Sequence, residues 1–405
     1  GWSFDITVHL MTEWRRNTLG SLIRVKHGWP FKSELMVEDA GDAPIVVSVG
    51  NFQYNGGFRF EATKTRGYVG DYPSEYLLTP GDILLIMTCQ TEGGEILGIP
   101  GVIPDDGKKY LHNQRLGKVV LLQPDEISSS FLYWYFLTQE FNLQLVGSAS
   151  GTKIVHTAPS RIEACEILLP PKPEQEAIGS ILDRLNDKLD LLRRQCQTLE
   201  AMADALFRQW FLEDPSPTWD QRALSSIATF LNGLACQKYP PVNEVDKLPV
   251  LKIRELSSGI NEGSEWASSR VKPEFIVEAG DVIFAWSASL MVKVWDGERC
   301  VLNQHLFKVS SNEFPKWFYL RWCKRHLDEF IAISSSHATT MGHIKRGDLD
   351  AAVVLVPQPD EMQAMTAQMA PLLDKQIEIT RQRRTLETLR NTLLPKLMSG
   401  EVRVA

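Results

Sequence analysis

The sequence has few cysteines and none of the spacings that make cysteine a metal ligand or a disulfide partner. The six cysteines of this 405-residue chain are scattered, with no Cys-x-x-Cys pair and no histidine at ligand spacing. That pattern argues against zinc and disulfides and fits a reducing cytoplasm. No apolar run approaches the roughly 20 residues that span a bilayer, and no basic segment followed by an apolar stretch opens the chain. We therefore expect a cytoplasmic protein without membrane insertion or secretion.

Sequence signatures of catalysis are also missing. Gly101–Lys109 comes closest to a phosphate-binding P-loop, but it is one residue too long and has lysine where a hydroxyl belongs. The Pro-Pro pairs at 170–171 and 240–241 lack the preceding Asn or Asp and the following aromatic residue of an amino-methyltransferase. Pro104–Lys108 contains the residue types of a nuclease carboxylate–lysine site, but they lie within a single turn instead of on separate strands. This spacing favours a solvated loop. We expect neither an active site nor a bound cofactor.

The chain lacks the surplus of positive charge that is typical of proteins binding nucleic acid on their own. Its 43 Lys and Arg residues face 50 Asp and Glu residues, a net charge of −7. Residues 12–170 contain 14 basic and 18 acidic residues, and residues 215–357 contain 16 of each. Phosphate neutralisation dominates affinity for nucleic acid. If this protein reads DNA, a partner must supply much of the phosphate contact.

The most informative feature is a series of landmarks that occurs twice in the same order. The matched pairs are Trp14/Trp219, Leu19/Leu224, Gly28/Gly233, Pro80–Leu84/Ala279–Ile283, Asn113-Gln114/Asn303-Gln304, Thr152/Thr339, His156/His343, Leu168–Pro170/Leu355–Pro357 and Thr198–Glu200/Thr385–Glu387. Two copies are too few for a solenoid, which needs at least three units. They suggest a chain that acts as its own pseudo-dimer, with one module for each part of a two-part target.

A long helix is predicted after each copy. Between Ile178 and Trp210 apolar residues alternate in steps of four and three, the a/d seam of a helix packed along another helix. Pro215 and Pro217 should end it. The second seam, Met365 to Leu393, keeps sevenfold spacing, and Pro371 is expected to kink that helix or delay its start. Its companion positions are polar: Gln376, Arg383 and Arg390. Antiparallel pairing of the two helices within one chain is expected, with a homodimeric coiled coil as the alternative.

These patterns predict an α+β fold in which two similar domains alternate with two long helices. Short apolar runs separated by Gly, Pro and Asn indicate strands, and each copy should contain a helix, at 129–145 and 317–333. The predicted boundaries are domain 1 at residues 1–170, a central helix at 171–214, domain 2 at 215–357 and a C-terminal helix at 358–405. The two copies share the same order of landmarks but have loops of unequal length. This implies that the two domains recognise different targets.

Recurring polar residues are the candidates for contact with DNA. The side-chain amides of the Asn-Gln pairs can hydrogen-bond to adenine. Both copies, however, keep the pair and change the residue after it, which favours a structural role in bracing a turn. Arg115 and His305 are therefore the better readout candidates, and arginine suits guanine. Polar loops close onto two histidines that have no recurring Ser, Cys or carboxylate partner for catalysis. These loops either offer backbone N–H groups to phosphate or serve only as turns. The candidate residues in them are Thr152, Lys153, His156, Thr339, Thr340 and His343.

The other candidates are basic residues in the loops of each copy. They are Lys26, Arg59, Lys64, Arg66, Lys108 and Lys109 in domain 1, and Lys238, Arg254, Arg270, Lys272 and Lys293 in domain 2.

Taken together, the chain resembles the specificity subunit of type I restriction–modification enzymes. The resemblance covers nearly the whole chain and depends on the Trp–Leu–Gly opening, Pro80–Leu84, Asn113-Gln114, the Gly-Thr loop, and Leu169–Gln175 leading into a long helix. Each motif alone is weak, and their ordered duplication is strong. The second copy departs from the pattern, with Glu361 where glutamine is usual.

This resemblance implies two target-recognition domains, each reading one half of a split, asymmetric site in double-stranded DNA. The helical pair, with pseudo-two-fold symmetry, would set the spacer and dock two methyltransferase subunits. Those subunits would bind S-adenosylmethionine and methylate adenine, and up to two restriction/motor subunits would use ATP and Mg²⁺. This chain itself would hold no cofactor and no catalytic site. The alternatives are a coiled-coil scaffold with two protein-binding modules, and a one-chain restriction enzyme.

Overall fold

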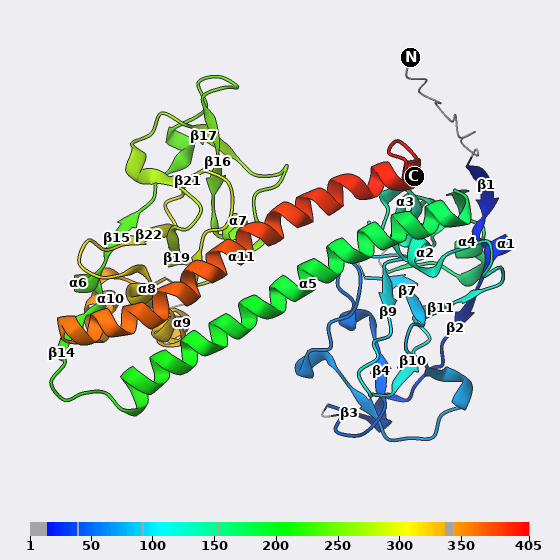
Figure 1. The fold of residues 1–405 in the computed structure, drawn as a ribbon, viewed down its shortest axis with the longest axis horizontal. Helices are drawn as coiled ribbons and strands as arrows, with labels where there is room; N and C mark the ends of the chain where they lie inside the picture. Colours follow the sequence, from blue (N-terminus) through cyan, green and yellow to red (C-terminus); the bar gives the residue numbers. More distant parts are fainter. Residues whose placement is uncertain (1–13, 39, 91–92, 152–153, 337–342, 405) are drawn as a thin grey trace, which may run out of the picture. The chain divides into compact units, whose positions relative to one another are not determined.

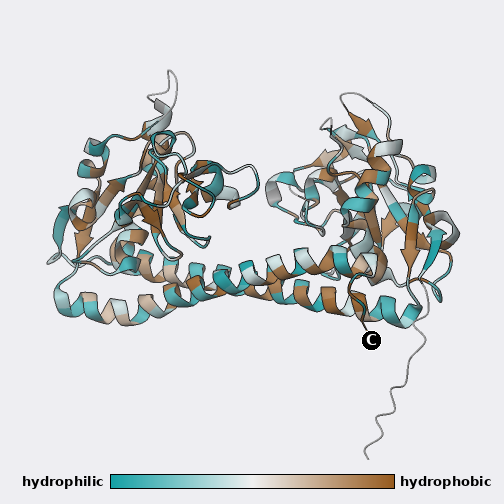
Figure 2. Ribbon diagram, turned by 90° about the horizontal axis from the view of Figure 1, so that it is seen from above, coloured by the Kyte–Doolittle hydropathy of each residue, from teal (hydrophilic) through white to brown (hydrophobic). Residues whose placement is uncertain are grey.

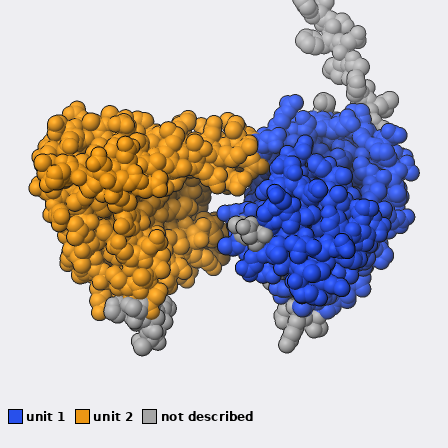
Figure 3. Space-filling view, turned by 90° about the horizontal axis from the view of Figure 1, so that it is seen from below, with its two compact units in different colours: residues 1–187, 388–405 blue, residues 188–387 orange. Residues whose placement is uncertain are grey.

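The computed structural model describes residues 14–38, 40–90, 93–151, 154–336 and 343–404 of the chain. Internal contacts divide the chain, drawn as a ribbon in Figure 1, into two compact units that Figure 3 shows in different colours: unit 1 comprises residues 1–187 and 388–405, and unit 2 comprises residues 188–387. Each unit contains one globular domain together with a segment of each long helix. The division therefore falls within the two helices and not between a domain and its helix.

The globular part of unit 1 is built from short strands and short helices. In chain order they are β1 (Arg15–Thr18), α1 (Leu19–Leu22), β2 (Ile23–His27), η1 (Ser33–Leu35), β3 (Met36–Val37), β4 (Ile45–Val47), η2 (Val49–Asn51), η3 (Ala62–Lys64), β5 (Gly67–Tyr68), η4 (Ser74–Tyr76), β6 (Leu77–Leu78), β7 (Ile83–Ile86), β8 (Thr88–Cys89), β9 (Pro100–Val102), β10 (Tyr110–His112), β11 (Leu116–Leu121), α2 (Ser129–Phe136), α3 (Gln139–Ser148), β12 (Val155–His156), α4 (Pro159–Glu163) and β13 (Glu166–Leu169). The strands form a four-stranded sheet, β2–β11–β7–β9, a five-stranded sheet, β3–β5–β4–β10–β6, and the pairs β1–β13 and β12–β8.

Unit 2 repeats this arrangement. Its elements are β14 (Asp220–Ala223), α6 (Leu224–Ile227), β15 (Thr229–Asn232), η6 (Cys236–Lys238), β16 (Lys247–Leu251), α7 (Ile253–Ser258), β17 (Trp266–Ser268), η7 (Pro273–Phe275), β18 (Ile276–Val277), β19 (Val282–Ala285), β20 (Met291–Val294), β21 (Cys300–Leu302), β22 (Leu306–Ser310), α8 (Lys316–Arg325), α9 (Leu327–Ser336), α10 (Arg346–Ala351) and β23 (Val353–Val356). The sheet β15–β22–β19–β20 and the pair β14–β23 match those of unit 1, and the sheet β17–β16–β21–β18 matches its five-stranded sheet without a counterpart of β3. The parallel pairing of β4 with β10 recurs between β16 and β21. The duplicated sequence thus gives a duplicated topology, as predicted.

The Pro-Gly-Asp landmark is a turn that introduces the central strand of each four-stranded sheet. Gly81 has a φ of +90°, a conformation that suits glycine because it has no Cβ. The carboxylate of Asp82 accepts the backbone N–H of Thr79 at 2.8 Å and pairs with Lys118 Nζ at 2.6 Å. The same arrangement recurs in unit 2, with Gly280 at φ +101°, Asp281 accepting a backbone N–H at 2.9 Å, and Lys308 Nζ at 2.8 Å.

The main core of each unit lies between its four-stranded sheet and its helices (Figure 2). The helix expected at 129–145 is in fact two helices, α2 and α3. Thr138 separates them because its hydroxyl accepts the N–H of Phe141 at 3.3 Å and so caps α3. The helix expected at 317–333 is likewise divided, into α8 and α9. His326 lies at this break, with its Nε2 2.9 Å from the carbonyl oxygen of Val353.

The two long helices, α5 (Lys172–Arg208) and α11 (Pro359–Ser399), lie side by side and antiparallel within each unit (Figures 1 and 2). In unit 1, Ile178 and Leu182 of α5 share a core with Leu397 and Met398 of α11. In unit 2, the end of α5, continued as a π-helix at Gln209–Glu213, packs against the start of α11. Antiparallel pairing within one chain is therefore confirmed. Among the described residues, no helix is long and apolar enough to cross a membrane.

The structure corrects one part of the expectation for Pro371: the start of the helix is not delayed, because α11 begins at Pro359 and continues through Pro371. Proline leaves the carbonyl four residues earlier without a donor, and here both Pro371 and Ala367 are exposed, so water can satisfy that carbonyl. The polar seam was predicted correctly: Gln376 and Arg390 are buried. Arg390 donates to Asn186 Oδ1 of α5 at 3.1 Å, a polar contact that favours one register of the pair.

The duplicated tryptophan at the start of each domain contacts the first turn of the following long helix. Trp14 Nε1 donates to Glu174 Oε2 at 3.1 Å, and Trp219 Nε1 donates to Glu361 Oε2 at 2.7 Å. Glu361 is therefore the counterpart of Glu174. This corrects the expectation from the sequence that Glu361 replaces the glutamine of the motif. Gln175, which accepts the N–H of Ser128 at 2.9 Å, corresponds instead to Met362.

We expect Trp14→Phe and Trp219→Phe each to lower the free energy of unfolding by about 1.5 kcal/mol, since each removes one hydrogen bond to a carboxylate. Burial raises the pKa of Glu174, but hydrogen bonds from Arg403 and Trp14 outweigh it and hold that pKa below its ordinary value. A carboxylate with a depressed pKa stabilises at neutral pH and loses this effect as pH falls. The Trp14→Phe difference should therefore shrink below about pH 4.

Urea titrations of the full chain at several pH values would measure these differences. Trp266→Phe is the matched control, because Trp266 is 45% exposed and its indole N–H has no partner among the described residues. That variant should stay within about 0.5 kcal/mol of the wild type. An equal effect of all three substitutions would contradict the assignment of the tryptophan–glutamate contacts.

Candidate nucleic-acid interface

The Gly and Asn-Gln landmarks of each copy meet in one tight contact. In unit 1 the N–H of Trp29 donates to the carbonyl of His112 at 2.9 Å, and Gly28 lies so close that a Cβ there would be 2.1 Å from the Asn113 carbonyl oxygen. In unit 2 a Cβ on Gly233 would be 2.2 Å from the Asn303 carbonyl oxygen. Only glycine allows this approach in either unit.

The Asn side chains brace the turn, as the sequence favoured. Asn113 Oδ1 accepts the backbone N–H of Arg115 at 3.0 Å, and Asn303 Oδ1 accepts that of His305 at 3.3 Å. His112 adds a further brace, since its Nε2 is 2.8 Å from the Leu116 carbonyl oxygen. Burial lowers the pKa of His112 to about 4, with the hydrogen bond to Leu116 opposing the shift, so the ring is neutral at pH 7.

Each braced turn leads into a row of side chains carried by three adjacent segments. In unit 1 the N–H of Met87 donates to the Arg115 carbonyl, and the N–H of Thr157 donates to the Met87 carbonyl, both at 3.0 Å. In unit 2 Trp286 takes the place of Met87, with its N–H 3.4 Å from the His305 carbonyl oxygen. We call Met87, Thr88, Arg115 and His156 row 1, and Trp286, Ser287, His305 and His343 row 2.

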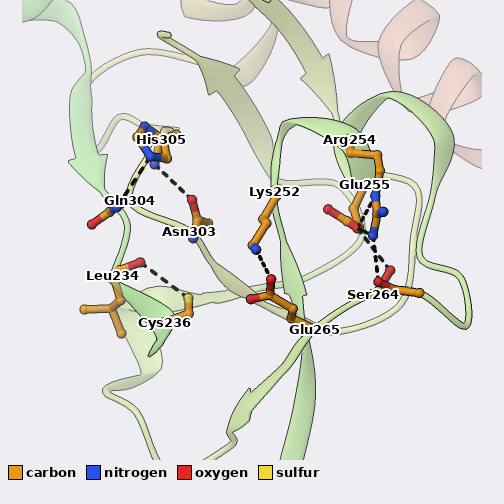
Figure 4. A network of polar contacts seen from close by, with 11 residues as sticks. Leu234, Cys236, Lys252, Arg254, Glu255, Ser264, Glu265, Asn303, Gln304 and His305 are labelled. Carbon is orange, nitrogen blue, oxygen red and sulfur yellow. Dashed lines mark hydrogen bonds and ion pairs between the residues drawn. The ribbon is translucent and has the colours of Figure 1, made fainter. Parts of the chain in front are cut away.

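The two rows share a framework but differ in chemistry. Thr88 Oγ1 lies 3.1 Å from His156 Nδ1 in row 1, whereas Ser287 Oγ lies 3.2 Å from His305 Nδ1 in row 2. Trp286 packs its ring against both histidines of row 2, with centroid distances of 6.0 and 6.3 Å. Figure 4 shows His305 beside Asn303 and Gln304. Row 1 thus presents a guanidinium and an imidazole, and row 2 presents two imidazoles and an indole.

Sequence reasoning missed the middle residues of both rows. Met87-Thr88 and Trp286-Ser287 directly follow the apolar strands β7 and β19. Of these four residues, Thr88 and Trp286 are partly exposed, whereas Met87 and Ser287 are buried and support the row from below its surface. Their position directly after a buried strand was the available signal. Thr152, Lys153, Thr339 and Thr340 lie outside the described residues.

The predicted basic residues divide into paired and unpaired groups. Paired with carboxylates are Arg59 and Lys64 with Glu61, Arg66 with Glu38, Arg254 with Glu255, Arg270 with Asp246 and Lys293 with Asp296. Exposed, and without an ion pair among the described residues, are Lys26, Lys108, Lys109, Arg115, Lys238 and Lys272. The unpaired group has charge available for phosphate or base contact without first breaking an internal pair.

Arg254 is the member of the paired group with the clearest structural role (Figure 4). Its Nε and Nη2 donate to Glu255 Oε1 at 2.9 and 2.7 Å, and the side chain of Glu255 is only 1% exposed. Burial raises the pKa of Glu255, but the contact with Arg254 more than offsets it and leaves that pKa below its ordinary value. Losing Arg254 would leave a buried carboxylate poorly compensated.

The sequence motif at residues 104–108 is a turn in the structure. Asp106 Oδ1 accepts the N–H of Lys108 at 3.1 Å, and Asp106 Oδ2 accepts the hydroxyl of Tyr110 at 2.8 Å. This agrees with the solvated loop favoured from the sequence. Within the described ranges no group of three or more His, Cys, Asp or Glu residues is placed to hold a metal ion.

Known proteins match this chain in both sequence and fold. A curated relative, the type I restriction enzyme MjaIX specificity subunit of Methanocaldococcus jannaschii, is 23% identical over 309 residues, covering 70% of this chain and 71% of that protein. The type I restriction enzyme EcoBI specificity subunit of Escherichia coli is 23% identical over 192 residues, 46% of this chain and 40% of that protein. A crystal structure of the type I restriction–modification S subunit from M. genitalium shares the fold, with a TM-score of 0.62, 15% identity and 97% coverage of both chains.

The type I restriction modification DNA specificity domain matches twice, at residues 11–201 and 217–388. The two matches correspond to the two copies of the sequence landmarks and include both rows. They agree with the prediction of a non-catalytic recognition subunit, since the family is one of DNA specificity. This chain belongs to the type I restriction–modification DNA specificity family, with two copies of its domain.

Proposed function

We propose that this chain reads a bipartite, asymmetric site in double-stranded DNA, with one half read by each domain. The observation that carries the proposal is the pair of rows: one braced framework, used twice, presents different side chains. Base edges are distinguished by the pattern of donors and acceptors that meets them. Two frameworks with different donors therefore suit two different half-sites.

We further propose that two methyltransferase subunits dock on the helical pair. Met202 of α5 and Leu389 of α11 occupy matched positions, 187 residues apart, and are 49% and 44% exposed. Single exposed apolar residues are common on protein surfaces, so it is the equivalence of the two positions that suits two copies of one partner. The absence of a basic surplus in either domain supports the same conclusion, because a partner would then supply the phosphate contacts.

If methyltransferase subunits dock on the helical pair, the role of that pair and the cofactors of the partner subunits follow. The helical pair would fix the number of base pairs between the two halves of the site. The partner methyltransferases would bind S-adenosylmethionine, and up to two restriction/motor subunits would use ATP and Mg²⁺ in the cytoplasm. None of these cofactors is assigned to this chain, whose own contribution is to bind and position DNA.

The proposal is tested by producing the chain in cells with and without its neighbouring methyltransferase and sequencing the methylome. We expect a bipartite adenine-methylated motif only when both proteins are present. In electrophoretic binding assays the chain alone should bind weakly and lose affinity steeply with salt, whereas the complex should bind that motif tightly. Equal affinity with and without the partner would argue strongly against it. A protein-binding scaffold would show no DNA preference in either case, and a one-chain enzyme would methylate DNA unaided.

A further inference from the structure

Arg115 differs from the other arginines described in domain 1. Each of the others has a partner: Arg15, Arg16, Arg24, Arg59 and Arg66 pair with carboxylates, and Arg161 donates to Ser150 Oγ and the His156 carbonyl. The guanidinium of Arg115 makes no ion pair or hydrogen bond within the described structure, and the residue is exposed. A guanidinium has five N–H donors in a rigid, planar fork. In Arg115 the whole fork is available to a ligand.

The backbone that carries this side chain is held from both sides. The Asn113 carboxamide fixes the N–H of Arg115, and the N–H of Met87 fixes its carbonyl. The side chain therefore extends from a backbone that is already fixed, so that less freedom is lost on binding than for a residue on an unbraced loop. Precise base contact requires this kind of support, because specificity depends on the placement of donors to within a fraction of an ångström.

The matched position in domain 2 is chemically different. His305 replaces Arg115, and its Nδ1 and Nε2 lie 3.2 Å from Ser287 Oγ and 3.4 Å from Gln304 Nε2. An imidazole with both nitrogens engaged in this way presents no free pair of parallel donors. The two rows therefore cannot select the same base in the same manner at this position.

We propose that Arg115 recognises a guanine in the half-site of domain 1, and that His305 does not select guanine at the matched position of the other half-site. Guanine offers two acceptors, O6 and N7, along its major-groove edge, and the arginine fork can donate to both at once. Lysine carries the same charge but has no fork. This inference rests on the proposed DNA-reading function and names the base that one row reads.

The experiment uses the complete complex with its methyltransferase and the motif obtained from the methylome. Each guanine of the domain 1 half-site is replaced in turn by adenine, and separately by 7-deazaguanine, which lacks N7. In the wild type, adenine at one of these positions should weaken binding about 5- to 150-fold, the discrimination of one bidentate contact. In Arg115→Ala the same base change should alter binding less than about 2-fold. Arg115→Lys should keep the salt dependence of the wild type and weaken the guanine preference, because an ammonium can reach the same acceptors but lacks the planar fork.

Arg16→Ala is the matched control. Arg16 is an exposed arginine of β1 outside row 1, its guanidinium lies 3.7 Å from Glu166, and its loss removes the same charge. This variant should keep the wild-type preference at every guanine. If the motif exists and Arg115→Ala retains full guanine discrimination throughout the half-site, the inference about Arg115 is wrong although the proposed function stands. If no sequence-specific binding or methylation occurs with the wild-type complex, the proposed function itself fails.

Discussion

Glu200→Ala is expected to destabilise unit 2 by about 1.5–3 kcal/mol, the usual worth of hydrogen bonds to a charged group, because it leaves the buried Arg321 with Asp204 as its remaining carboxylate. Arg321 of α8 is only 4% exposed, and its Nη1 and Nη2 each lie 3.0 Å from an oxygen of Glu200 on α5. Asp204 also contacts Arg321, and Lys324 Nζ lies 2.5 Å from Glu200. Glu200 thus compensates a buried guanidinium that attaches domain 2 to its long helix.

The sequence repeat provides a matched control for this variant. Glu387 occupies the equivalent position on α11, but its side chain is 44% exposed and its nearest cation, Arg383, lies within the same helix at 3.4 Å. Pairs of this kind contribute about 0.2–1 kcal/mol, so Glu387→Ala should have a small effect. Glu200→Ala combined with Arg321→Leu should recover much of the loss, because no charge is then left buried.

The cost of Glu200→Ala should also depend on pH. Burial raises the pKa of Glu200, but the charges of Lys324 and Arg321 outweigh it, and that pKa lies below its ordinary value. The stabilisation is therefore fully present at neutral pH and is lost as pH falls below about 4. Urea titrations at pH 7 and in mild acid would measure both effects. Equal losses for Glu200→Ala and Glu387→Ala would contradict this account.

The sequence predicted the duplication and the helical pair because both depend on short-range periodicity. The a/d seam of α5 and the polar positions Gln376 and Arg390 of α11 could be read from spacing alone, and both polar side chains are buried. The delayed start expected from Pro371 was wrong because the effect of a proline on a helix depends on exposure. A carbonyl left free inside a core would stop a helix, whereas the exposed carbonyl at Ala367 can bind water.

The contacts that join distant segments could not be predicted from the sequence. Trp14 and Glu174 are 160 residues apart, and nothing local to either indicates the other. The rows were predicted only in part. Arg115 and His305 could be identified because the residue after the Asn-Gln pair differs between the two copies while the pair itself is constant. Trp286 stands out only when its ring is seen packed on both histidines.

Gly28→Ala and Gly233→Ala are expected to abolish recognition of one half-site each, and a different half in each case. The added Cβ would lie 2.1 or 2.2 Å from a backbone carbonyl oxygen, which has no flexible end that could move aside. The turn carrying Arg115 or His305 must therefore shift, at a cost of about 1–3 kcal/mol or more for overpacking. Because the displaced groups include the backbone that braces the reading residue, we expect the loss of specificity to exceed the loss of stability.

Two helical glycines provide the controls, Gly147 in α3 and Gly347 in α10, since a Cβ on either would meet nothing within 4 Å. Alanine there should be neutral or stabilise by about 0.5–1 kcal/mol, and binding to the motif should not change. The decisive comparison is methylome sequencing of cells carrying each variant with the partner methyltransferase. Gly28→Ala should relax one half of the motif and Gly233→Ala the other. If both substitutions relaxed the same half, or relaxed both halves equally, the two rows could not be independent readers. A division between the halves would show that each glycine supports its own reading side chain.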